Sequence, residues 1–192
     1  MSPDEARRLR ADAQLNHDRL LDAAARAFTR DGTEASLKAI ARDAGVGIGT
    51  LYRRFPTREA LVEATYRSEV TRMCAAAPEL LQAWPAADAL RAWMDRFVEF
   101  LAAKHGMADT LRAILVSEAD RLHTRELLTG ALATLIEAGV AEGSIRPDAA
   151  PADVLMGLGG VSLIAGRPDQ RDLADRLLGL LMDGLRYQPP PL

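Results

Sequence analysis

The stretch Ala41–Val62, ARDAGVGIGTLYRRFPTREALV, contains the end of one helix, a turn, a second short helix and the start of a third. Ser36 stands directly before the apolar periodicity of LKAIARDA, which predicts an N-cap, and Gly45 is placed to end that helix in the left-handed conformation. The glycines that follow allow a tight reversal, and Pro56 closes the second helix. Together these signals predict a helix-turn-helix.

The second of these helices has two chemically different faces. Ile48, Leu51 and Phe55 recur at i, i+3 and i+7, so their spacing predicts an apolar face directed at the first helix. The outward side carries small residues, hydroxyl groups and guanidinium groups: Gly49, Thr50, Tyr52, Arg53 and Arg54. Such a helix start lets backbone amides and hydroxyls meet phosphate oxygens, while the arginines reach base edges or flanking phosphates. The pattern indicates a helix that reads DNA.

A helical hairpin with two solvated arginines is the alternative to a DNA-reading helix. Two arginines alone would favour that hairpin, because charged side chains are mostly exposed on ordinary protein surfaces. The cap, the turn, the apolar register and the outward donors nevertheless occur together over residues 36–55. This combination favours DNA.

The distribution of charge along the chain points the same way. The 192 residues carry a formal net charge of −3, which by itself does not suggest a nucleic-acid partner. Residues 1–58 nevertheless hold 11 basic and 8 acidic side chains, whereas residues 59–192 hold 13 basic and 19 acidic ones. A net basic N-terminal part on an acidic body is typical of a protein whose first segment faces DNA.

The rest of the chain predicts helices and no strand. Apolar residues make up 48% of the chain and aromatic residues 5%, with alanine and leucine dominant, a composition that favours helix. Apolar residues recur at helical spacing from Leu20 to Phe28, and the helix that Thr57 caps is expected to end before Pro78. Further helices are expected at Leu90–Leu101, around Leu111, Ile114 and Leu115, from Thr124 to about Gly143, from Pro151 to about Gly166, and over Asp169–Arg186. The predicted fold class is all-α, with about nine helices.

The segment GVGIGTLYRRFPTREALVEA resembles the recognition-helix region of the TetR family of bacterial transcriptional repressors. The resemblance covers roughly residues 14–66, where turn, helix and following cap match in order. It implies a three-helix DNA-binding head over residues 14–56, with the helix-turn-helix at about 36–55. A larger helical body over residues 57–186 would bind an effector and form dimers, and residues 1–13 and 187–192 would be flexible tails.

The resemblance also implies which residues contact DNA. Family positions that touch DNA are matched by Ser36, Lys38, Thr50, Tyr52, Arg54 and Arg58, with Gly49 at the start of the recognition helix. Arg53 is added because it lies on the outward face. In two places this sequence departs from the family pattern: Arg54 stands where a histidine is common, and Ile48 stands where a polar residue can read bases. Both departures bear on base preference and not on DNA binding.

Dimerisation is expected through the last two long helices, Pro151–Ala165 and Asp169–Arg186. The second carries a leucine-rich stripe and the first an apolar stripe interrupted by glycines, so each would expose apolar surface if it were alone. Pairing two copies would bury both stripes in a four-helix bundle. The residues expected at this interface are Leu158, Val161, Leu177 and Leu181. A twofold dimer predicts a pseudo-palindromic operator.

An effector pocket is expected beside the long helix that leaves the head. Its candidate lining is apolar or aromatic: Trp93, Met94, Phe97, Phe100, Met107 and Leu111. Such a lining favours an apolar or aromatic small molecule over a sugar or a metal ion. Each residue taken singly also fits a packed core, so the prediction applies to the group.

Other chemistries fit the sequence less well. The GLGG of residues 157–160 has no preceding strand and lacks the GxGxxG spacing of a phosphate loop. His17, His105 and His123 are far apart and have no metal-ligand spacing. Ser117 has no nucleophile elbow around it. We therefore expect neither an enzyme nor a cofactor or metal site.

The sequence also bears on location. A single cysteine, Cys74, permits no internal disulfide, and the N-terminal residues have no apolar core of the kind found in signal peptides. No run reaches the roughly 18 apolar residues that a membrane span needs. A cytoplasmic protein with no membrane partner is expected.

The predicted function is that of a sequence-specific DNA-binding transcriptional regulator. It would be a repressor homodimer, released from a double-stranded, pseudo-palindromic operator by a small-molecule effector. The alternative is a helical-bundle small-molecule binder or enzyme whose helix-turn-helix is vestigial. Binding to the DNA beside the protein's own gene distinguishes the two.

Overall fold

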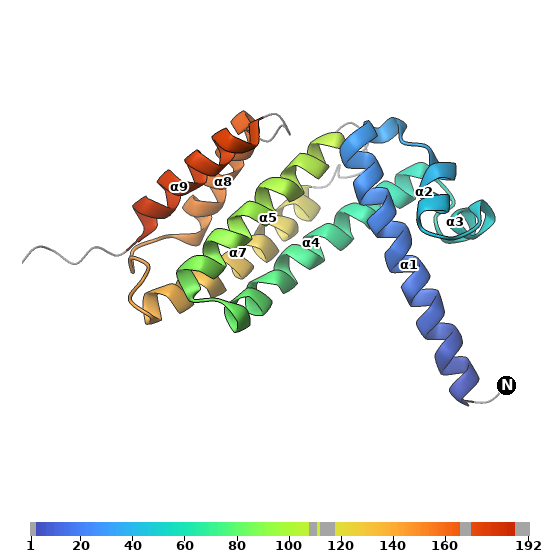
Figure 1. Ribbon diagram of the computed structural model, residues 1–192, viewed down its shortest axis with the longest axis horizontal. Helices are drawn as coiled ribbons and strands as arrows, with labels where there is room; N and C mark the ends of the chain where they lie inside the picture. Colours follow the sequence, from blue (N-terminus) through green and yellow to red (C-terminus); the bar gives the residue numbers. More distant parts are fainter. Residues whose placement is uncertain (1–2, 108–110, 112–117, 166–169, 187–192) are drawn as a thin grey trace, which may run out of the picture. The chain divides into compact units, whose positions relative to one another are not determined.

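The computed structural model describes residues 3–107, 111, 118–165 and 170–186. Within these residues the chain forms eight α-helices, one 3₁₀ turn and no strand, which confirms the all-α prediction and is close to the nine helices expected. The helices are α1 (Pro3–Asp31), α2 (Leu37–Asp43), α3 (Ile48–Arg54), α4 (Arg58–Ala83), α5 (Ala86–Gly106), α7 (Glu118–Ala141), α8 (Pro151–Ala165) and α9 (Arg171–Leu185), and the 3₁₀ turn η1 is Gly32–Glu34 (Figure 1). The predicted helix with Ile114 and Leu115 lies outside the described residues, Leu111 apart, as does the predicted tail at 187–192.

The chain divides into two compact units. Unit 1 comprises Met1–Glu69 and Ala103–Val116, and unit 2 comprises Val70–Ala102 and Ser117–Leu192. The division falls within α4, so this helix contributes residues to both units. The sequence places the end of the DNA-binding head earlier, at residue 56.

In unit 1, the first three helices pack around one apolar face of α1. α1 contacts α2, and α2 contacts α3 (Figure 1). The residues of α1 predicted to share an apolar face are all buried: Leu20, Leu21, Ala24, Ala27 and Phe28. The chain leaves α1 through Gly32, whose φ of +65° lies in the left-handed region that glycine adopts readily. The first three helices therefore share a core.

In unit 2, α8 packs against both α7 and α9. The Glu142 carboxylate, just after α7, accepts a hydrogen bond of 2.9 Å from the Ala86 amide and so caps the start of α5. Arg91 of α5 forms an ion pair with Asp175 of α9. Polar contacts thus join the helix ends and surfaces around an apolar core.

α4 continues through Pro78, so the prediction that it ends before this proline is wrong. Proline inside a helix removes one hydrogen bond, clashes with the preceding turn and costs about 3 kcal/mol. The helix nevertheless buries an apolar face on both sides of the proline: Met73, Ala76, Ala77 and Leu80. Burial of one large apolar side chain contributes about 1.5–3 kcal/mol, so this face offsets the cost of the proline.

Two helices begin earlier than predicted, and one begins where expected. α1 starts at Pro3, so residues 3–13, predicted to be a flexible tail, are helical. α7 starts at Glu118 and not at Thr124. α8 begins at Pro151 as predicted, because the fixed φ of proline suits the first helical position. Among the helices described, none combines the length and apolar character that crossing a bilayer requires.

Candidate nucleic-acid interface

The helix-turn-helix is formed by α2 and α3. Ser36 is the N-cap of α2, and its Oγ accepts a hydrogen bond from the Ala39 amide at 3.3 Å. Gly45 has a φ of +72°, as expected for the residue that follows the helix end. α3 begins directly after Gly47 and ends at Arg54. The predicted cap, turn and second helix are confirmed.

One face of α3 is buried in the head, but it is smaller than predicted. Leu51 is fully buried and Phe55 is buried. Ile48 is 39% exposed, so its assignment to the apolar face is wrong. Ile48 is the first residue of α3, and side chains of a helix lean toward its N-terminus, so this one projects past the core of the head. An exposed apolar side chain therefore stands at the start of α3.

The opposite face of α3 presents polar groups to solvent. Tyr52, Arg53 and Arg54 are exposed, and Thr50 is half-buried. Arg53 donates a hydrogen bond from Nη2 to the Thr50 Oγ1 at 3.2 Å, which joins two of the predicted DNA contacts. Lys38 of α2 is exposed as well. Hydroxyl and cationic groups are therefore available on this surface, as the phosphate backbone of DNA would require.

Arg58 has a structural contact in unit 1. Its Nη1 donates a hydrogen bond to the Ala35 carbonyl oxygen at 2.7 Å. The bond joins the first residue of α4 to the residue before the Ser36 cap, so it helps to hold α2 in place. The role of Arg58 as a DNA contact stays a prediction.

His17 of α1 makes a contact that the sequence did not reveal. The Nε of Arg54 donates a hydrogen bond to His17 Nδ1 at 3.0 Å, and the imidazole stacks on the Phe55 ring with centroids 5.5 Å apart. Burial lowers the pKa of His17, the Arg54 cation lowers it further, and Asp18 acts in the opposite direction. His17 and Arg54 are 37 positions apart, so only the packing of the head brings them together.

The two glycines of this region should respond oppositely to alanine. Gly45→Ala should lower the free energy of unfolding by about 1–2 kcal/mol, because a β-carbon is strained at φ of +72°. Gly49→Ala should raise it by about 0.5–1 kcal/mol, because Gly49 is helical and a β-carbon there meets no atom within 4 Å. Urea denaturation of the DNA-free protein measures both. Equal changes in the two variants would contradict the assigned turn.

Family profiles match both parts of the chain. The profile described as bacterial regulatory proteins, tetR family, matches residues 20–65, which contain the helix-turn-helix. The profile described as transcriptional regulator SbtR-like, C-terminal domain, matches residues 85–187, more than half of the chain. The chain belongs to the TetR family. It is therefore a transcriptional regulator with a helix-turn-helix domain, and TetR regulators bind operator DNA and dimerise.

Solved structures of TetR regulators share the fold of this chain. The TetR transcriptional regulator SCO0520 from Streptomyces coelicolor is 50% identical, over 90% of this chain and 99% of that chain, with a TM-score of 0.83. A TetR regulatory protein from Mycobacterium vanbaalenii is 32% identical, over 93% of this chain and 99% of that chain, with a TM-score of 0.77. The similarity to both therefore includes the helices that follow the head.

A third relative matches over a shorter length. The uncharacterized HTH-type transcriptional regulator Rv1255c of Mycobacterium tuberculosis is 46% identical over 61 residues. The match spans 31% of this chain and 30% of that relative. The two proteins are therefore similar over one segment and not over their whole lengths.

In this TetR-family regulator, α8 and α9 leave large apolar side chains exposed. Leu163 is 78% exposed, Leu180 69%, Ile164 63% and Met156 61%. We call these four residues the α8–α9 stripe. α8 and α9 pack against each other, and exposed apolar surface on neighbouring helices is typical of a site of association.

The residues predicted at the dimer interface differ in exposure. Val161 and Leu177 are half-buried, whereas Leu158 is fully buried within the protomer and so presents no surface to a partner. Leu181 is also half-buried, and its Cδ1 would lie 3.6 Å from a β-carbon at Gly157 of the same chain. The glycine notch of α8 therefore accommodates α9 of the same chain.

The residues predicted to line an effector pocket are all buried: Trp93, Met94, Phe97, Phe100, Met107 and Leu111. The first four belong to unit 2, and Met107 and Leu111 belong to unit 1. The Trp93 Nε1 donates a hydrogen bond to the Met73 carbonyl oxygen at 2.9 Å, and its ring stacks on Phe97. The Trp93 indole is thus fixed by a hydrogen bond at its edge and by stacking on its face.

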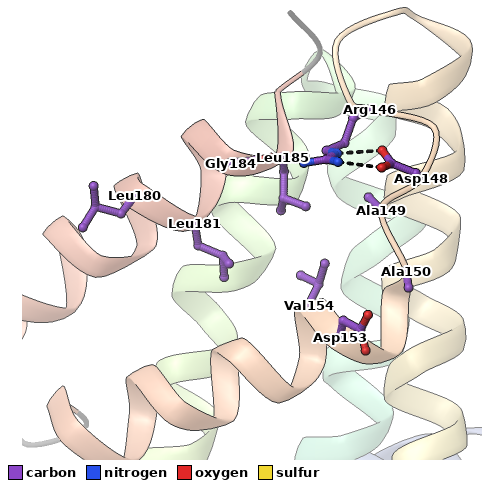
Figure 2. Close-up of a pocket in the computed structure, with 10 residues that line it drawn as sticks. All are labelled: Arg146, Asp148, Ala149, Ala150, Asp153, Val154, Leu180, Leu181, Gly184 and Leu185. Carbon is purple, nitrogen blue, oxygen red and sulfur yellow. Dashed lines mark hydrogen bonds and ion pairs between the residues drawn. The ribbon is translucent and has the colours of Figure 1, made fainter.

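A cavity of about 310 Å³ lies elsewhere in unit 2, between the segment before α8, the first turn of α8 and the last turns of α9 (Figure 2). Val154, Leu181 and Leu185 point into it, and the Arg146–Asp148 ion pair stands at its edge. The remaining lining residues are Ala149, Ala150, Asp153, Leu180 and Gly184. None of the residues predicted to bind an effector lines this cavity. In the part of the chain that the structure describes, no group of three or more His, Cys, Asp or Glu side chains is placed to hold a metal ion.

Proposed function

We propose that this regulator is a homodimeric, sequence-specific repressor whose α3 face contacts the operator. The observation that carries the proposal is the division of α3 into a buried side with Leu51 and an exposed side with Tyr52, Arg53 and Arg54. The buried side holds the helix rigidly on the head, and the exposed side offers a hydroxyl and two guanidinium groups. Phosphate contacts fix the position of a protein on DNA, and arginines read base edges.

The α8–α9 stripe supports the dimer. Two copies that pack these helices together would bury four large apolar residues from each protomer in a four-helix bundle. A twofold dimer presents two copies of α3 to two half-sites, so the operator would be pseudo-palindromic. The stripe takes the place of Leu158 in the proposed interface, because that side chain is fully buried within the protomer. Val161, Leu177 and Leu181 are half-buried and remain proposed interface residues.

Release from the operator would follow from binding of an apolar or aromatic small molecule. Trp93, Met94, Phe97 and Phe100 provide apolar and aromatic side chains along α5, the composition that suits such a ligand. An effector changes DNA affinity only when it binds two states of the dimer with different affinities. α4 belongs to both units, so a change in its tilt would act directly on the head.

The DNA contacts predict different results for two substitutions on α3. Tyr52→Phe should weaken binding about equally on all sequences, because a phosphate contact carries no base information. Arg54→Ala should cost about 1–3 kcal/mol at a single base pair of each half-site, because a bidentate arginine discriminates one guanine. Gel-shift titration on operator and substituted DNA, at one fixed salt concentration, measures both.

The starting probe for these titrations is the intergenic DNA beside the protein's own gene. A uniform loss of affinity in Arg54→Ala would make Arg54 a phosphate contact. Failure of the unmodified chain to prefer this DNA, or any selected DNA, over random sequence would refute the proposed function.

A further inference from the structure

We propose that His17 is a positioning residue that holds Arg54 in the orientation in which it reads DNA. The proposal rests on the proposed function and adds a residue outside the helix-turn-helix to the specificity of the head. It derives from one hydrogen bond and one ring contact, which together fix the guanidinium between α1 and α3.

The support beneath Arg54 is a ring that stacks on a buried side chain of the head. Phe55 is buried, and the His17 ring stacks on it at an interplanar angle of 28°. His17 in turn lies on α1, whose next turn carries the buried Leu20 and Leu21. The imidazole is therefore stacked on a buried ring, and its Nδ1 offers the Arg54 Nε an acceptor at 3.0 Å.

The hydrogen bond leaves the reading end of the arginine available. A guanidinium has five N–H donors, and only the one on Nε points to His17. Nη1 and Nη2 carry the other four, and among the described residues no hydrogen bond from them to a protein group is formed. These are the donors that make a fork toward guanine O6 and N7 or toward a phosphate. A long side chain fixed in advance also loses less rotamer freedom on binding.

The contact requires a neutral imidazole. Nδ1 accepts a hydrogen bond only when it carries no proton, and a protonated ring would stand against the Arg54 cation. Among the described residues, the charged groups that act on His17 are Arg54 from α3 and Asp18 from its own helix. Asp18 also accepts a hydrogen bond from Gln14 at 2.9 Å. Burial and Arg54 prevail over Asp18, so the pKa of His17 lies below the ordinary value of 6.5 and the ring is neutral at neutral pH.

Acidification should therefore lower specificity, not overall affinity. As the pH falls through the pKa of His17, the ring gains a proton, the Arg54 hydrogen bond breaks and the guanidinium is no longer oriented. The added positive charge favours every DNA sequence, because phosphates attract it regardless of base. The quantity to measure is the ratio of affinities for the selected operator and for the same DNA with the Arg54-dependent base pair replaced.

Two variants separate positioning from packing. His17→Asn keeps an acceptor oxygen at the position of Nδ1 but cannot be protonated, and His17→Leu keeps apolar volume on Phe55 without an acceptor. The wild type should discriminate roughly 5–150-fold at about pH 7.5. In a pH series this discrimination should decline as the pH falls through the pKa of His17, which lies below 6.5. His17→Asn should keep the discrimination throughout the pH series, and His17→Leu should lack most of it throughout. His123→Gln, an exposed histidine of α7, is the matched control and should keep the wild-type pH profile.

A measurement without DNA checks the contact independently. Nitrogen chemical shifts of the His17 ring should show an unprotonated Nδ1 at neutral pH, and Arg54→Ala should raise the pKa of His17 because a nearby cation is removed. A protonated Nδ1, or undiminished discrimination in His17→Leu, would overturn the positioning role. If the ring shows the expected state but the wild type discriminates no DNA sequence, both the proposed function and this role fail. If DNA is discriminated equally by the wild type and both variants, only the positioning role fails.

Discussion

Leu163→Glu and Leu180→Glu should each convert the dimer to a monomer and weaken operator binding by about 10²–10⁴-fold. Both side chains are more than two-thirds exposed in the protomer, so a charge at either position leaves the protomer core intact. In the bundle of the proposed dimer, the same charge would be buried without a partner, at a cost of several kcal/mol. A monomer loses the effective concentration that joins the second head to its half-site. Light scattering after gel filtration and gel-shift titration measure the two effects.

The matched control for these variants is Leu122→Glu. Leu122 is 52% exposed on α7, outside the α8–α9 stripe, so its replacement should leave both the dimer and operator binding unchanged. Leu181→Glu should also weaken the dimer, and because the half-buried Leu181 contacts Gly157 within the protomer, it should lower the free energy of unfolding as well. A stable dimer in both Leu163→Glu and Leu180→Glu would move the interface to another surface.

Trp93→Ala should lower the free energy of unfolding by about 3–5 kcal/mol. Trp93 is fully buried, so removal of the indole leaves a cavity and takes away the ring that stacks on Phe97. The Met73 carbonyl oxygen would also lose its hydrogen-bond donor. Typical domains are stable by only about 5–15 kcal/mol, so this variant would approach the limit of folding. Urea denaturation measures the loss.

Trp93→Phe is the control that separates packing from hydrogen bonding. It keeps an aromatic ring and removes the Nε1 donor, so a smaller loss of about 1–3 kcal/mol is expected. Trp93 is also among the side chains proposed to bind the effector, so a Trp93→Ala variant that still folds should lose release by the effector and hardly change its DNA affinity in the absence of effector. A loss below about 1 kcal/mol in Trp93→Ala would contradict the packed arrangement around the indole, and release by the effector that persists in this variant would place the pocket elsewhere.

Features with a local physical cause could be predicted from the sequence. The Ser36 cap, the left-handed Gly45 and the first position of α8 at Pro151 each depend on one residue and its immediate neighbours. The same holds for Thr57, whose Oγ1 accepts a hydrogen bond from the Ala60 amide at 3.1 Å at the start of α4. Caps and turns of this kind were enough to predict the helix-turn-helix from the sequence. The resemblance of this segment to the TetR family then predicted the family.

Features that depend on tertiary packing could not be predicted in this way. Helical periodicity predicts that Ile48 is buried on the same face as Leu51. In the structure Leu51 is buried but Ile48, the first residue of α3, is exposed. Proline ends most helices, yet the apolar face of α4 continues beyond Pro78. The Arg54–His17 bond joins two helices far apart in the chain. Each of these needs the position of a second element, which spacing along one helix does not contain.

The apolar residues of α8 and α9 are a further example in which the sequence alone could not predict the packing of individual side chains. The sequence shows that both helices carry apolar residues. It does not show which of these residues are buried within the protomer and which stay exposed for a partner. Leu158 is fully buried in the protomer, Leu181 is half-buried, and Leu163 and Leu180 are exposed. The direction in which each side chain points depends on how α8 crosses α7 and α9.

The most direct test of a dimeric, sequence-specific repressor is selection of bound sequences from a randomised double-stranded DNA library at fixed salt. We expect the unmodified chain to enrich a pseudo-palindrome whose half-site centres lie about 34–36 Å apart, or a multiple of that distance. Arg54→Ala should relax the preference at one base pair of each half-site and leave the spacing unchanged. Enrichment of no sequence, or of the same sequences after Thr50, Tyr52 and Arg54 are all replaced by alanine, would contradict DNA reading by α3.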